Sequence, residues 1–138
     1  MSERIVLGWR ERVSLPDWGI EDIIAKIDTG ARTSSIHVED LIELGDGRIQ
    51  FRVITNRRRR VSELVECTEH KKTIVRSSSG HATERHVVRT RLTIAGMTRE
   101  VDINLTARHT MTNRMLVGRT SLGDSFLVDP SIEFLTTL

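Results

Sequence analysis

The sequence predicts an all-β fold, a small barrel or sandwich of short strands with one helical turn near the C-terminus. Short apolar runs recur along the chain between turn-forming residues, and several alternate apolar and polar positions with period two. Aromatic residues make up only 4% of the chain, so the core must be aliphatic. The 138 residues suit one core, and we expect residues 1–138 to form a single domain.

The first half of the chain is expected to form strands separated by tight turns. Pro16 and the residues 17–19 end the second strand, and Gly45-Asp46-Gly47 is a strong hairpin turn. Positions 49, 51 and 53 are apolar while 50 and 52 are polar, so one face of that strand is buried. The expected strands are 4–8, 10–15, 20–27, 34–38, 41–44, 49–54 and 61–65.

The second half has clearer patterning. Apolar or β-branched residues at 88, 90, 92 and 94 share one face of a strand, and those at 101, 103 and 105 share one face of the next. Ala95-Gly96-Met97 joins them as a hairpin turn. Residues 118–122 can form one helical turn. The expected strands are 72–76, 88–94, 101–105, 114–117 and 126–129.

A carboxylate lies at the tip of the loop that follows the third expected strand. Asp28-Thr29-Gly30 interrupts an apolar run, and Gly30 allows another backbone to approach closely. The hydroxyl groups of Thr29 and Ser34 can donate hydrogen bonds that hold a carboxylate in place. The alternative is an Asx-type turn, in which Asp28 only bonds the backbone of its own loop.

Two motifs far apart in the chain carry a resemblance to a known family. Asp28-Thr29-Gly30-Ala31 and the segment 115–119 resemble the two signatures of the retropepsin-like aspartic proteases. Gly8-Trp9-Arg10, residues 26–33, Ser79-Gly80-His81 and residues 116–120 also resemble, in this order, the bacterial family labelled "ATP-dependent zinc protease", which is associated with ATP-grasp glutamate ligases. The resemblance spans residues 5–130 and implies the small closed barrel of the retropepsin-like fold.

The resemblance implies an aspartic peptidase that hydrolyses peptide or isopeptide-like bonds. Such an enzyme needs two carboxylates that share one proton, because like charges so close cannot both ionise. The chain has one Asp-Thr-Gly and is too short for two lobes, so we expect a homodimer in which two Asp28 residues meet across a two-fold axis. The candidate catalytic residues are Asp28, Thr29 and Gly30.

The resemblance also implies roles for residues around this pair. A hairpin tip at 77–81 can close over a peptide and exclude water, although an ordinary loop is the alternative. The candidate substrate-binding residues are Ala31, Arg32, Thr33, Ser79, Gly80 and His81. The candidate supporting residues behind the Asp28 loop are Leu116, Val117, Gly118 and Arg119.

One departure from retroviral relatives bears on the substrate. Those relatives have acidic residues after the Asp-Thr-Gly-Ala segment, and the Arg of their Gly-Arg pair forms a salt bridge to one of them. This chain has Arg32 and Thr33 at these positions. Arg119 therefore needs another partner, and Glu84 is one candidate. If Arg32 faces the cleft, it favours an acidic or glutamate-rich peptide or protein substrate. The alternative is that Arg32 pairs with an internal carboxylate.

Neither a metal site nor a cofactor site is expected. The chain has no His-Glu-x-x-His, Glu69-His70-Lys71 being the nearest fragment, and no Gly-x-x-x-x-Gly-Lys-Ser/Thr loop for ATP. The five histidines and Cys67 do not group by spacing into a ligand set, and His81 and His86 are expected at the surface. ATP dependence would then belong to a partner.

Composition and charge restrict the partners and the compartment that we expect for this protein. The net charge is +2, and the run Arg57–Arg60 is expected to be a solvated turn, so nucleic acid is not expected as a partner. The single cysteine favours a reducing compartment, and no apolar run approaches the ~18 residues of a membrane span. We therefore expect a cytoplasmic protein without membrane contact.

The sequence also allows a function other than catalysis. The same fold can serve as a catalytically inactive, dimeric binding or regulatory module for a partner protein such as an ATP-grasp ligase. The distance between two Asp28 carboxyl groups in a dimer distinguishes the two, because catalysis requires them within hydrogen-bond reach.

Overall fold

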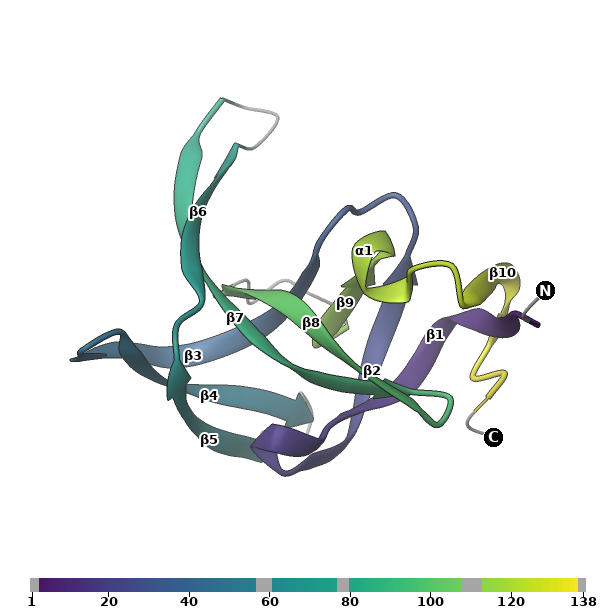
Figure 1. Ribbon diagram of the computed structural model, residues 1–138, viewed down its shortest axis with the longest axis horizontal. Helices are drawn as coiled ribbons and strands as arrows, with labels where there is room; N and C mark the ends of the chain where they lie inside the picture. Colours follow the sequence, from purple (N-terminus) through teal and green to yellow (C-terminus); the bar gives the residue numbers. More distant parts are fainter. Residues whose placement is uncertain (1–2, 57–60, 77–79, 108–112, 137–138) are drawn as a thin grey trace.

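The structure is a computed structural model that describes residues 3–56, 61–76, 80–107 and 113–136 (Figure 1). These residues form strands together with one 3₁₀ turn, η1 (Pro16–Trp18), and one short helix, α1 (Arg119–Leu122). The strands are β1 (Ile5–Leu15), β2 (Ile20–Asp28), β3 (Ser34–Gly45), β4 (Arg48–Asn56), β5 (Val61–Thr68), β6 (Lys71–Arg76), β7 (Ala82–Ile94), β8 (Met97–Thr106), β9 (Met115–Gly118) and β10 (Phe126–Glu133).

A closed barrel organises the strands. Neighbours pair in the order β1-β2-β9-β3-β8-β7, and a pairing of Ser14 on β1 with Thr93 on β7 closes the ring. Strand β10 adds to β1, β6 adds to β7, and β4 and β5 extend β3 into a second layer. The predicted all-β fold, a small closed barrel with a short helix near the C-terminus, is confirmed. In the part of the chain that the structure describes, no helix has the length and apolar composition to cross a membrane.

Two strands run through positions where the sequence pattern predicted breaks. Strand β1 continues past residue 9 with an irregular register between Gly8 and Arg10, and β3 continues past residue 40 with one between Glu39 and Ile42. Asp40 lies within this irregularity and has a φ of 55°, and the strand pairing resumes after it, as at a β-bulge. A bulge bends a strand without ending it, so the loss of alternation at these positions was misleading.

The core is aliphatic, as the composition predicts. Leu7 on β1, Ile36 on β3 and Ile103 on β8 are fully buried inside the barrel. The ring of Trp18 meets Phe51 edge-on with centroids 5.4 Å apart, and this pair covers the end of the core near η1.

The β6–β7 hairpin rises from the barrel on the same side as the loop between β2 and β3 (Figure 1). At its base, Lys72 Nζ lies 3.1 Å from Glu43 Oε1 on β3, which joins the hairpin to the outer layer. This ammonium group lowers the pKa of Glu43, and the carboxylate raises the pKa of Lys72. The run Arg57–Arg60 and the tip residues 77–79 lie outside the described residues.

A buried carboxylate ties the C-terminal segment to β1. Glu11 is 0% exposed, and its Oε2 accepts hydrogen bonds from Gly8 N at 2.7 Å and Leu135 N at 2.9 Å. Its Oε1 accepts from Thr136 N at 3.3 Å and Thr136 Oγ1 at 3.0 Å. The carboxylate therefore satisfies backbone donors from two segments more than 120 positions apart.

We predict that Glu11→Ala destabilises the fold by about 3 kcal/mol, because several buried donors lose their acceptor at once. Urea unfolding followed by circular dichroism measures this loss. Glu21→Ala is the control, since Glu21 is an exposed carboxylate on the neighbouring strand. Equal midpoints for the two variants would show that the Glu11 contacts do not hold the C-terminal segment.

Candidate active site

Asp28 is the last residue of β2, and the strand beside it fixes its position. Strand β2 runs parallel to β9, with Lys26 opposite Leu116, Ile27 opposite Val117 and Asp28 opposite Gly118. Ile27 and Val117 are buried in the core. The predicted supporting segment therefore lies beside the Asp28 loop, and two rigid strands hold the base of that loop.

The loop turns sharply after Asp28. Gly30 N donates to Asp28 Oδ1 at 3.0 Å, and Ala31 N donates to the Asp28 carbonyl at 3.2 Å. The Asx turn considered from the sequence is therefore present. Asp28 Oδ2 lies 3.9 Å from Lys26 Nζ, and the side chain is 27% exposed. One carboxylate oxygen is fixed by the backbone while the group stays accessible from solvent.

Ser34 anchors the loop rather than the carboxylate, which corrects the expectation from sequence. Its buried Oγ accepts a hydrogen bond from Gly118 N at 3.0 Å and lies 2.6 Å from Ser121 Oγ. The hydroxyl pair thus joins the start of β3 to the end of β9 and to α1. No sequence motif marks Ser121. Its role is seen only in the structure, where it is buried beside Ser34.

Gly118 is required by a close approach of two backbones. A Cβ atom at this position would lie 2.5 Å from the Thr33 carbonyl oxygen and 2.9 Å from Thr33 N. Any larger residue must push the chain after the Asp28 loop away from β9.

The start of α1 binds the carbonyl groups of the Asp28 loop. Arg119 N donates to the Ala31 carbonyl at 2.9 Å, and Thr120 donates to the Arg32 carbonyl through both N and Oγ1, at 3.1 and 2.8 Å. The Arg119 guanidinium donates to the Gly30 carbonyl at 3.4 Å. Glu84, the partner suggested for Arg119, instead has an oxygen 4.0 Å from Lys72 Nζ.

A cavity of about 380 Å³ lies between the Asp28 loop and the β6–β7 hairpin. Its lining residues are Arg32, Thr33, Lys71, Thr73, Ile74, Val87, Asp102 and Asn104. Arg32 faces this cavity, and within the described residues it forms no ion pair with a carboxylate. Of the predicted substrate-binding residues, Gly80 and His81 are exposed near the hairpin tip and do not line the cavity, while Ser79 lies outside the described residues.

The carboxylate inside this cavity already has a partner. Arg89 donates to Asp102 Oδ1 from Nε at 2.8 Å and to Oδ2 from Nη2 at 3.3 Å. These hydrogen bonds lower the pKa of Asp102 and raise the pKa of Arg89, so both groups stay charged and compensate each other. Arg32 and Lys71 add two positively charged side chains to the lining of this cavity.

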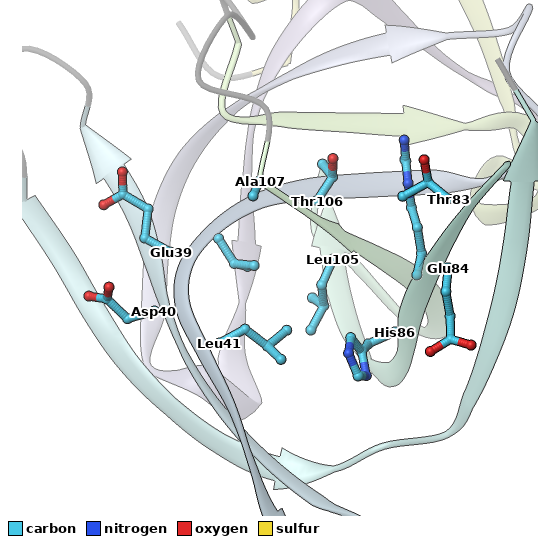
Figure 2. Close-up of a pocket in the computed structure, with 11 residues that line it drawn as sticks. Glu39, Asp40, Leu41, Thr83, Glu84, His86, Leu105, Thr106 and Ala107 are labelled. Carbon is cyan, nitrogen blue, oxygen red and sulfur yellow. The ribbon is translucent and has the colours of Figure 1, made fainter. Parts of the chain in front are cut away.

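A second cavity of about 480 Å³ lies at the foot of the same hairpin. Figure 2 shows Glu39 and Asp40 on one side of it and Glu84 and His86 on the other. Its lining contains none of the candidate catalytic residues.

The fold brings together one set of ligating side chains that spacing did not group. Ligand atoms of Glu43, Glu69 and His86 lie within 4.8 Å of one another, among the residues that the structure describes. His86 is only partly exposed, and its Nδ1 lies 2.9 Å from Glu69 Oε1. The Lys72 ammonium group beside Glu43 already supplies a cation to this cluster.

The comparisons with known proteins agree with this geometry. A family model described as "Retropepsin-like aspartic endopeptidase RimB" matches residues 6–137. The chain belongs to this RimB-like family. The Asp28 loop and the Gly118 segment, which carried the resemblance in sequence, lie side by side in this structure.

Curated relatives extend beyond this domain. Proteins named "Probable alpha-L-glutamate ligase" from Shewanella pealeana and Desulfotalea psychrophila are 32% and 33% identical over 136 and 133 residues. The matches cover 95% and 93% of this chain but only 30% and 28% of those proteins. The chain thus spans less than a third of the length of these relatives.

A solved structure has the same fold. The crystal structure of Lpg0085 from Legionella pneumophila, described as a protein of unknown function, superposes with a TM-score of 0.80. It is 25% identical in sequence, and the match covers 97% of this chain and 99% of that chain.

We predict that Ser34→Ala lowers the free energy of unfolding by about 1–3 kcal/mol, because Gly118 N is left buried without an acceptor. Ser35→Ala is the matched control on the adjacent, half-buried position. Chemical denaturation of both variants measures the difference. A Ser34 variant as stable as the Ser35 variant would contradict the anchoring role of the buried hydroxyl.

Proposed function

We propose that this RimB-like chain is an aspartic peptidase that acts as a homodimer, with one Asp28 from each protomer. The observation that supports this most is the fixed carboxylate: Gly30 N orients Asp28 Oδ1, and the group remains 27% exposed at the end of a rigid strand. A structural Asx turn alone does not need the further bonds from β9 and α1 that hold the loop.

The chemistry needs two such groups. One carboxylate deprotonates a bound water that attacks the scissile carbonyl, and the carboxyl group that holds the shared proton assists the carbonyl oxygen and then the leaving nitrogen. The proton moves between groups that are already present, so no metal ion is required. Gly30 lets two loops approach each other without a side chain between them.

Charge near the loop supports an acidic peptide or protein as the substrate. Arg32 and Lys71 line the cavity beside the Asp28 loop, and Asp102 in that cavity is compensated by Arg89. Guanidinium and ammonium groups bind carboxylates through charge-assisted hydrogen bonds.

The second candidate function is a binding or regulatory module without hydrolysis. It is favoured by the relatives named as probable glutamate ligases, in which the matching part is 28–30% of a longer protein. A domain that occurs within such proteins can also position a ligase or its acidic product. The two candidates differ in one respect that can be measured, which is whether Asp28 hydrolyses a peptide bond.

We predict that Asp28→Asn lowers the rate of peptide cleavage by about 10²–10⁴-fold, while the fold and the dimer persist. Asn is nearly isosteric and can still accept the bond from Gly30 N, but it cannot act as a base. Cleavage of glutamate-rich peptides is followed by mass spectrometry, and the dimer by sedimentation.

Asp22→Asn is the control for this experiment, because it removes an exposed carboxylate from the same strand. Retained cleavage by Asp28→Asn would refute the aspartic-peptidase function. A wild-type protein that cleaves nothing but binds acidic peptides would favour the module, and a monomer at high concentration would exclude the shared pair.

We also predict that EDTA leaves the cleavage rate unchanged, since the Asp28 loop uses no metal in the proposed reaction. The cluster of Glu43, Glu69 and His86 is separate from that loop and has its own cation in Lys72. A rate that falls in EDTA and recovers with added zinc would contradict this prediction.

A further inference from the structure

Lys26 is the first residue of the motif 26–33, and its side chain does not belong to the core. Its backbone is fixed in the sheet, because Lys26 pairs with Arg10 on β1 and with Leu116 on β9. Lys26 and Asp28 are two positions apart on β2, so their side chains lie on the same face of the sheet. The Lys26 side chain is 48% exposed, and its charged end lies beside the candidate catalytic carboxylate.

The two oxygens of the Asp28 carboxylate have different neighbours. Gly30 N donates to Oδ1 at 3.0 Å, whereas Lys26 Nζ lies 3.9 Å from Oδ2. At 3.9 Å the ammonium group attracts the carboxylate charge but is too far away to donate a hydrogen bond. Lys26 therefore places a positive charge next to Oδ2 and leaves the lone pairs of this oxygen to another group.

The residues that flank Lys26 on the neighbouring strands do not compete for Asp28. Arg10, opposite Lys26 on β1, has its Nη2 2.9 Å from Glu133 Oε2, so its charge is directed to the C-terminal segment. Leu116, opposite Lys26 on β9, carries no charge. The sheet thus presents Lys26 as the cation on the side of the carboxylate that faces along β2.

The cations of the loop itself are engaged elsewhere. The Arg119 guanidinium donates to the Gly30 carbonyl at 3.4 Å, and Arg32 lines the cavity towards the β6–β7 hairpin. Among the residues that the structure describes, Lys26 is therefore the ion-pair partner of Asp28.

Two chains that bring their Asp28 residues together also bring the neighbouring charges together. Two ionised carboxylates at short range repel each other. In a symmetric dimer each carboxylate arrives with its own Lys26 ammonium group, so two negative charges are matched by two positive ones. An interface that excludes water strengthens these attractions.

We infer that Lys26 is a positioning residue of the Asp28 pair: its ammonium group offsets the repulsion between the two carboxylates and so stabilises their approach across the two-fold axis. The inference rests on the proposed function for the pair itself, and it gives a role to a residue that the proposed reaction does not use. Because Lys26 donates no hydrogen bond to Oδ2, it acts through its charge and leaves the proton transfer to the carboxyl groups.

The first experiment measures the affinity of the dimer by sedimentation at neutral pH and low ionic strength. We expect Lys26→Gln to weaken the dimer about tenfold, and Lys26→Arg to stay within about threefold of wild type because arginine keeps the charge. At about 1 M salt, wild type and Lys26→Gln should dimerise equally, since screening removes the attraction. Equal affinities at low ionic strength overturn the inference.

Arg48→Gln is the matched control for this measurement. It also removes one cation from an exposed ion pair, that of Arg48 with Glu66 on the outer layer, and it should leave the affinity of the dimer unchanged. A loss as large as that of Lys26→Gln would show that net charge alone is responsible and would overturn the inference.

The second experiment tests whether Lys26 acts through Asp28, and it needs no hydrolysis. In the Asp28→Asn protein the carboxylate charges are absent, so the addition of Lys26→Gln should change the affinity of the dimer by less than about twofold. A tenfold loss in this background as well would show that Lys26 acts on another group, which overturns the inference.

The outcomes separate this inference from the proposed function. A dimer that depends on the charge of Lys26 but cleaves no peptide supports the inference and contradicts the peptidase. A dimer that cleaves peptides and is unaffected by Lys26→Gln contradicts the inference and leaves the peptidase intact. A wild-type protein that stays monomeric at high concentration overturns both.

Discussion

The parallel pairing of Asp28 with Gly118 is the constraint on which the rest of the site depends. The backbones approach so closely at Thr33 that only glycine fits at position 118, and the Ser34 hydroxyl bonds the Gly118 amide from the other side. Strands β2, β3 and β9 of the barrel therefore meet at one point. Because α1 begins at Arg119, its first residues can also donate hydrogen bonds to the carbonyl groups of Ala31 and Arg32 in the loop.

Local patterns predicted the parts of this arrangement that depend on neighbouring residues. Alternation of apolar residues identified most strands, and the loop at Asp28 and its partner segment at Gly118 were identified from two short motifs. Ser34 was assigned to the carboxylate because it is near in sequence, whereas the fold turns it towards Ser121. No sequence pattern predicted the role of Glu11, because residues 135 and 136 come close to it only when β1 pairs with β10. Such contacts depend on the pairing register of strands that are far apart in the sequence, and no single stretch of sequence specifies that register.

Charge is distributed more unevenly than the net value of +2 suggests. At the foot of the β6–β7 hairpin, Lys72 is bound to Glu43 and His86 lies against Glu69, so opposite charges face each other. On the other side of the hairpin, Arg32 and Lys71 line the cavity near Asp28, where Arg89 is the ion-pair partner of Asp102. Consecutive lysines on β6 thus have different environments, since successive side chains of a strand point to opposite faces. One anchors the hairpin and its neighbour faces the cavity.

The proposed pairing of Asp28 residues from two chains would explain why the loop is both firmly held and exposed. One carboxylate cannot hold the shared proton and act as the base towards water at the same time, so hydrolysis needs a second acid at short range. A carboxylate buried within its own barrel could not meet a second one, whereas a side chain that is 27% exposed at the end of a strand can. Rigidity is needed for the same reason, because two like-charged groups stay close only if their backbones are held from behind. The buried bond between Ser34 and Gly118 and the bonds from α1 to the loop carbonyl groups supply that support. The exposed side, with Gly30 at its tip, is the surface on which a second copy of the chain would complete the site.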